Sequence, residues 1–163
     1  MIFGMSDALF TTIHVIISLI AILAGLVVVI GMPRNRHSGP WAAIYLVLIA
    51  FTSLTGYPIP PLGFDPPRLI GTISLVLIIM AVAALYVFHL GGVWRAIYVV
   101  TATAALYFNC FVGVVQAYGK VPFMHALAPT QSSPLFAVTQ LAVLVIFIAL
   151  GYLGVKRFRP TAV

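Results

Sequence analysis

The sequence has very little negative charge and almost no cysteine. Asp7 and Asp65 are its only acidic residues among 163, and Cys110 is its only cysteine. Hydrolysis by a carboxylate pair therefore has no support, and neither a nucleophile beside a base nor a glycine-rich phosphate loop is visible. A single cysteine also excludes an intrachain disulfide and a cysteine metal cluster.

Charge of either sign is scarce, whereas apolar residues are abundant. Only 6% of the residues are charged, 63% are apolar, and the mean hydropathy is +1.21. These values lie far outside the usage of soluble domains and indicate a membrane protein. The basic residues lie at the ends of apolar segments, where they anchor helices or meet lipid headgroups, so we expect the lipid bilayer as a partner and no nucleic acid.

Five apolar segments predict an all-α integral membrane helical bundle that forms a single transmembrane domain over residues 1–163. The helices are expected at about 9–32, 41–57, 68–88, 94–118 and 135–155. A spanning helix needs about 20 residues, so the 41–57 segment is short and the bundle has four spans if it does not cross. The first segment lacks a basic region before it, so we expect it to be retained rather than cleaved as a signal peptide.

The connections between these segments carry helix-breaking residues. Five prolines in residues 58–67 predict a stiff, non-helical connection, and residues 89–93 predict a tight glycine turn. The longest connection, 119–134, contains six residues between two prolines, 123–128, for which we predict a short helix on the membrane surface.

The basic residues predict the orientation. With five spans, Arg68 and Lys120 fall on the side of the N-terminus, whereas six basic residues fall on the other side: Arg34, Arg36, Arg95, Lys156, Arg157 and Arg159. Basic residues in short loops favour the cytoplasm, which places the N-terminus outside and the C-terminus inside.

Polar residues within the apolar segments are the candidate site, because an unpaired polar group in hydrocarbon costs several kcal/mol. The candidates are His14, Asn109, Gln116, His125 and Gln140. Helical spacing predicts a stripe of small and polar residues on one face of the first segment and another on one face of the fourth. The first stripe is His14, Ser18, Ala21 and Gly25, and the second is Ala102, Ala105, Asn109, Gly113 and Gln116. The stripes are interpreted either as helix-packing seams or as the lining of a periplasm-facing polar vestibule under the 119–134 connection.

The histidines raise the question of a cofactor. His14 and His89 are expected near opposite membrane faces, roughly 20 Å apart along the normal by helix rise, so one haem iron cannot join them. No metal site is predicted, and a haem or quinone in the vestibule has little support. Asp65 and Arg68 are expected to pair at the outer rim, where an exposed ion pair contributes little.

Three stretches resemble an uncharacterised group of small bacterial multi-pass inner-membrane proteins. They are 89–95 (HLGGVWR), 107–116 (YFNCFVGVVQ) and 120–131 (KVPFMHALAPTQ). The resemblance implies location in a bacterial inner membrane and no particular activity.

From these observations we expect a non-catalytic protein, an accessory or assembly subunit of a larger membrane complex or a homo-oligomer. The alternative is a protein that binds a small molecule, such as a quinone, haem or small solute, or that handles protons through the polar vestibule.

Overall fold

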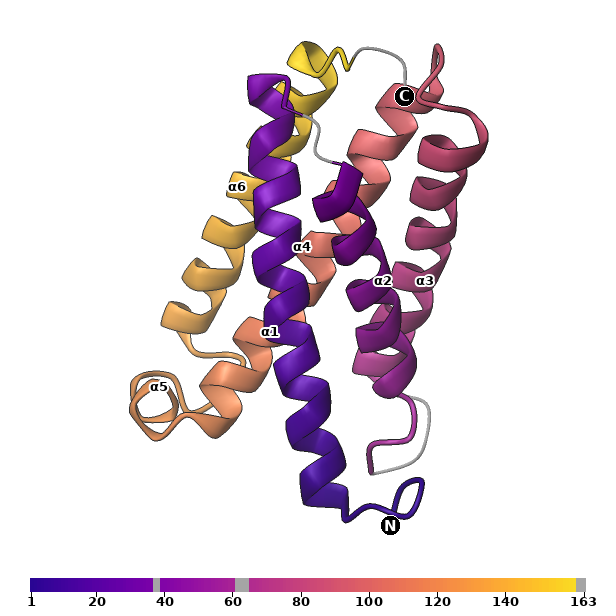
Figure 1. The fold of residues 1–163 in the computed structure, drawn as a ribbon. Coiled ribbons are helices and arrows are strands. Elements are labelled where there is room, and N and C mark those ends of the chain that lie inside the picture. The colour runs from indigo at the N-terminus through magenta and orange to yellow at the C-terminus, as the bar shows by residue number, and fades with distance from the viewer. Residues whose placement is uncertain (37–38, 61–64, 161–163) are drawn as a thin grey trace.

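A computed structural model describes residues 1–36, 39–60 and 65–160 of the chain. Within these ranges it is an all-α bundle without strands, as predicted, and successive long helices run antiparallel (Figure 1). The elements are α1 (Asp7–Gly31), the 3-10 turn η1 (Met32–Arg34), α2 (Gly39–Thr55), α3 (Pro66–Val82), the π-helical turn η2 (Ala83–Val87), α4 (Trp94–Lys120), α5 (Pro122–Leu127) and α6 (Pro134–Arg157).

Four of these helices, α1, α3, α4 and α6, are long and apolar enough to cross a membrane. The fifth, α2, has 17 residues and is about 25 Å long, slightly less than the ~30 Å hydrocarbon core. It nevertheless carries the chain from one end of the bundle to the other, because α1 and α3 both begin at the same end (Figure 1). The bundle is therefore a membrane bundle in which the second traverse is short.

The two ends of the bundle differ in charge. Six basic residues lie in the first or last turn of a helix, or just after a helix, at one end of the bundle. We call this the basic end: Arg34, Arg36, Arg95, Lys156, Arg157 and Arg159. Arg68, Lys120 and both acidic residues lie toward the opposite end. The predicted segregation of basic residues is thus present in the fold, and which end faces the cytoplasm stays a prediction.

Helix α4 is the centre of the bundle. It crosses behind α1 and α2 and lies against α3 on one side and α6 on the other (Figure 1). At the crossing of α1, α2 and α4, a Cβ added to Gly25 would stand 2.6 Å from Leu106 Cδ1 and 2.7 Å from Tyr45 Cε2. The buried Tyr45 hydroxyl donates to the Ala102 carbonyl at 2.7 Å. Absence of a side chain at Gly25 therefore permits this three-helix contact.

The prediction that residues 58–67 are entirely non-helical is wrong at its C-terminal end. Asp65 caps α3 by accepting from the Arg68 N–H at 3.0 Å, and Pro66 opens the helix. Proline suits this place because the first turn has no partner for its N–H groups and the ring already fixes a helical φ. Residues 61–64 lie outside the described residues.

The predicted pair of Asp65 and Arg68 is present and is more than a surface contact. The Arg68 side chain is only 11% exposed, and its Nη1 lies 2.6 Å from Asp65 Oδ2. Its Nε and Nη2 donate to the carbonyls of Tyr57 at 3.2 Å and Ile59 at 2.7 Å. One guanidinium group therefore holds the start of the α2–α3 connection onto the first turn of α3.

The third helix ends differently from its prediction. Regular α-helix stops at Val82, and a π-helical turn follows it. In the predicted glycine turn after it, His89 and Leu90 have positive φ as well as Gly92. The rings of Phe88 and Trp94 stack with centroids 3.7 Å apart across this turn, which fixes the start of α4.

Candidate functional site

His14 lies on α1 in the half of the bundle away from the basic end, and it pairs with α2. Its Nδ1 is 2.8 Å from Thr55 Oγ1. The Thr55 hydroxyl donates to the Phe51 carbonyl at 2.6 Å, so its single hydrogen is used. In the neutral imidazole that satisfies both contacts, Nδ1 of His14 is the donor and Nε2 carries the lone pair. The sequence predicted His14 but not its partner.

Gln140 joins α6 to α4. It is 9% exposed, and its Nε2 donates to the Phe111 carbonyl at 3.1 Å. Its buried Oε1 and the buried Nδ2 of Asn109 on α4 have no hydrogen-bond partner within the described ranges. These two amides are polar atoms that the bundle encloses at a cost.

His125 lies on α5, the short helix predicted after the fourth span. Its Nδ1 is 3.2 Å from the Tyr118 carbonyl. The Thr139 hydroxyl donates to the Leu135 carbonyl at 2.8 Å, so the Tyr118 hydroxyl is the donor in its 2.9 Å contact with Thr139. The ends of α4, α5 and α6 are therefore tied together around Tyr118, which the sequence analysis did not select.

The small and polar stripe of α4 is covered along only part of its length. Ala102 and Ala105 are completely buried where α4 crosses the rest of the bundle. Farther along the same face, Gly113 and Gln116 are exposed. A Cβ at Gly113 would meet only Ile22 of α1, at 3.8 Å. The covered part is a packing seam, whereas at Gly113 and Gln116 the face is open to the surroundings apart from the contact with Ile22.

The five predicted residues fall into two groups. His14 bonds α1 to α2, whereas the other four lie on α4, α5 and α6: Asn109, the exposed Gln116, His125 and Gln140. Toward the end away from the basic end, α1 runs apart from the end of α4 and from α5 (Figure 1). A common vestibule for all five residues stays a prediction.

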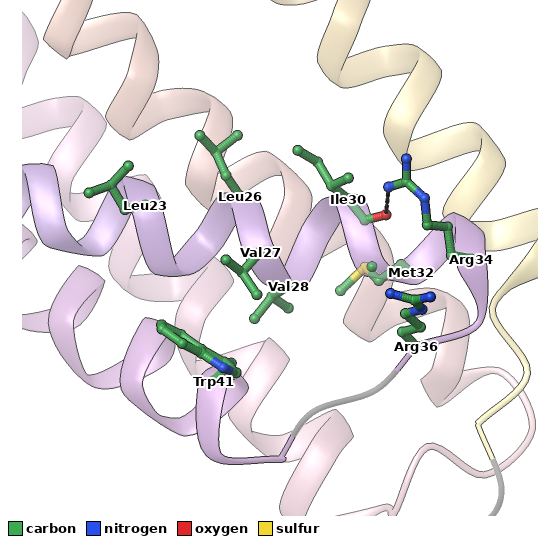
Figure 2. Close-up of a pocket in the computed structure, with 10 residues that line it drawn as sticks. Leu23, Leu26, Val27, Val28, Ile30, Met32, Arg34, Arg36 and Trp41 are labelled. Atoms are coloured by element: carbon green, nitrogen blue, oxygen red, sulfur yellow. Dashed lines mark hydrogen bonds between the residues drawn. The ribbon is translucent and has the colours of Figure 1, made fainter.

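A second feature was not anticipated from the sequence. A groove of about 560 Å³ runs along the last turns of α1 and reaches Trp41 at the start of α2, with Arg34 and Arg36 at one end (Figure 2). In the sequence, Arg34 and Arg36 pointed only to the orientation of the chain. That they line one groove depends on how α1 and α2 pack.

The described residues contain no group of three or more histidines, cysteines and carboxylates placed to hold a metal ion. Comparisons with protein families, with curated proteins and with solved structures give no match to this chain.

Proposed function

We propose that this chain is a non-catalytic integral membrane protein that functions by packing against another membrane-embedded helix. The partner is a subunit of a larger complex or a second copy of the chain, in a bacterial inner membrane. The contact is formed by the exposed end of the α4 stripe, Gly113 and Gln116, with the half-buried Asn109 at its inner edge. We call these three residues the α4 polar face.

The observation that carries this proposal is that one face of α4 is buried by other helices at Ala102 and Ala105 but exposed at Gly113 and Gln116. Gln116 lies four residues from the end of α4 and Asn109 eleven, or about 6 and 16 Å by helix rise. Because α4 has 27 residues and is about 40 Å long, its ends extend past a ~30 Å hydrocarbon core. Gln116 then lies near the edge of the hydrocarbon, and Asn109 lies near its middle.

The chemistry of this face suits a second helix. Glycine at position 113 allows another backbone to approach closely, and the Gln116 amide offers two donors and one acceptor. Gln116 makes no hydrogen bond within the described residues, so a helix that pairs with it would satisfy a group otherwise left facing lipid. Hydrogen bonds between membrane helices contribute about 0.6 to 2 kcal/mol each.

Site-specific photo-crosslinking in membranes tests the proposal. Gln116 is replaced by a photoreactive phenylalanine analogue, and the matched control carries the same replacement at Val138 of α6. Val138 is exposed and lies four residues from the start of its helix at the same end of the bundle. We expect discrete adducts from position 116 and none from position 138.

The mass of the adduct separates the two kinds of partner. An adduct of twice the chain mass that also forms in reconstituted pure protein indicates self-association. A larger adduct that forms only in native membranes indicates an accessory subunit. Equal labelling from both positions, or no protein adduct from position 116, contradicts the proposal.

One observation favours ligand binding beside His14 as a second candidate function. Because Nδ1 donates to Thr55, Nε2 is an acceptor, and it has no partner within the described residues. A hydroxyl group of a reduced quinone would fit it as a donor, and the same nitrogen is a haem ligand type. Gently purified protein that releases no quinone on organic extraction and shows no Soret band would exclude both.

A further inference from the structure

The groove at the basic end exists because α2 is shorter than α1. Helix α1 has 25 residues and α2 has 17, and α2 begins below the last turns of α1 (Figure 1). Those turns therefore lack α2 as a neighbour. The residues along the groove are mainly aliphatic (Figure 2): Leu23, Leu26, Val27, Val28, Ile30 and Met32.

This groove opens to the bilayer rather than into the bundle. Leu23 is 65% exposed and Val27 is 50% exposed, and Trp41 on α2 is 45% exposed. Leu23 lies eleven residues from Arg34, or about 16 Å by helix rise, which is half of a ~30 Å hydrocarbon core. The groove thus extends over roughly one leaflet, the length that a lipid acyl chain occupies.

The backbone after α1 places two guanidinium groups at the groove's end. The Arg36 N–H donates to the Gly31 carbonyl and the Asn35 N–H to the Met32 carbonyl, with Asn35 at φ +54°, which is a Schellman cap with asparagine in the left-handed position. Arg34 Nη1 donates to the Ile30 carbonyl at 3.0 Å. In Figure 2 the two guanidinium groups lie on either side of Met32.

The charge around the groove favours an anion. The C-terminus of a helix carries a partial negative charge of about half a unit, which two full positive charges exceed. Both acidic residues, Asp7 and Asp65, lie at the other end of the bundle, so no side-chain carboxylate of the described residues lies near Arg34 and Arg36. The Arg36 side chain donates no hydrogen bond within the described part of the chain.

We propose that this groove is a binding site for an anionic phospholipid of the leaflet at the basic end. The lipid phosphate pairs with Arg34 and Arg36, and one acyl chain lies along Leu23 and Val27 beside Trp41. A zwitterionic lipid has the same acyl chains, but its headgroup carries no net charge that would attract Arg34 and Arg36. This site is at the opposite end of the bundle from the α4 polar face and does not depend on it.

Native mass spectrometry of the full-length protein in mild detergent, titrated with dioleoyl phosphatidylglycerol, tests this assignment. The test variant is R34Q/R36Q, and the control is K156Q/R157Q, which removes the same charge from the same end on exposed residues of α6. Each basic group near the surface attracts the anionic headgroup, so the loss of two should weaken phosphatidylglycerol binding about 30-fold. We expect this loss in R34Q/R36Q and a change of less than about threefold in K156Q/R157Q.

Two further arms separate a lipid site from general attraction to anions. Dioleoyl phosphatidylcholine should bind the wild type about as weakly as phosphatidylglycerol binds R34Q/R36Q, and inorganic phosphate should not displace the bound lipid. Equal losses in the two double variants, or no loss in R34Q/R36Q, overturn the proposal. If R34Q/R36Q loses its helical circular dichroism, R36Q alone is used, with the same two outcomes judged against R157Q.

Discussion

Adding one methyl group at Gly25 should destabilise the bundle at its tightest crossing. The new Cβ would lie 2.6 Å from Leu106 Cδ1 and 2.7 to 2.8 Å from two ring atoms of Tyr45, whereas ordinary contacts begin near 3.4 Å. Leu106 and Tyr45 are completely buried, and the Tyr45 ring is held by its bond to Ala102. Neither neighbour can move away without disturbing a second helix.

The expected magnitude follows from two opposing effects. Overpacking of a core costs about 1 to 3 kcal/mol, and loss of the Tyr45 hydrogen bond costs about 0.6 kcal/mol. Replacing glycine by alanine within a helix returns about 1 kcal/mol. We therefore expect Gly25→Ala to lower the free energy of unfolding by about 0.6 to 2.6 kcal/mol.

Reversible unfolding in mixed detergent micelles, followed by circular dichroism, measures this change. Gly119→Ala on α4 is the matched control, because no heavy atom lies within 4 Å of the added Cβ. It should be neutral or stabilising by up to about 1 kcal/mol. Combining Gly25→Ala with Leu106→Ala should cost less than the sum of the two single changes, since the methyl group then fills part of the space left by Leu106. Equal stability of Gly25→Ala and Gly119→Ala, or strict additivity in the double variant, would refute the reasoning.

Three further outcomes are expected. Arg68→Met should lower the free energy of unfolding by about 2 kcal/mol, since it leaves Asp65 Oδ2 and two backbone carbonyls without the guanidinium donor, and Arg157→Met should change it little. Arg95→Leu should speed amide exchange at Phe158 by about tenfold, because Arg95 donates to the carbonyls of Val155 at 2.9 Å and Phe158 at 2.6 Å; an unchanged exchange rate contradicts this role. His14→Leu should cost only about 0.6 to 1 kcal/mol in an unfolding titration, because the Thr55 hydroxyl keeps its bond to Phe51, and a loss of several kcal/mol would show a larger role for His14.

The positions of the helices could be read from the sequence because apolar length and helix-breaking residues are local properties. Each predicted segment overlaps an observed helix, including the short α5 between its prolines. The errors occur at helix ends. The number of prolines in 58–67 did not show that Pro66 occupies the first position of a helix, where the backbone N–H has no partner within the helix. The glycines of 89–93 did not show that His89 and Leu90 take positive φ.

The candidate site was predictable as residue types but not as contacts. Polar residues inside apolar segments identified His14 and Gln140, whereas their partners, Thr55 and the Phe111 carbonyl, lie on other helices. These pairings depend on the rotation and axial offset of neighbouring helices. When a helix is apolar on every side, its sequence does not show which face packs against a neighbour or at what offset along the axis.

The sequence by itself therefore determined an all-α membrane bundle, the approximate limits of its helices and the separation of basic residues to one end. Hydrocarbon imposes these features on each segment separately, through span length and the cost of charge. The tertiary structure decided that Arg68 holds a connection, that the α4 stripe is exposed at Gly113 and Gln116, and that a short α2 leaves a groove beside Arg34 and Arg36. These features arise from the relative lengths and packing of several helices, which no single segment encodes.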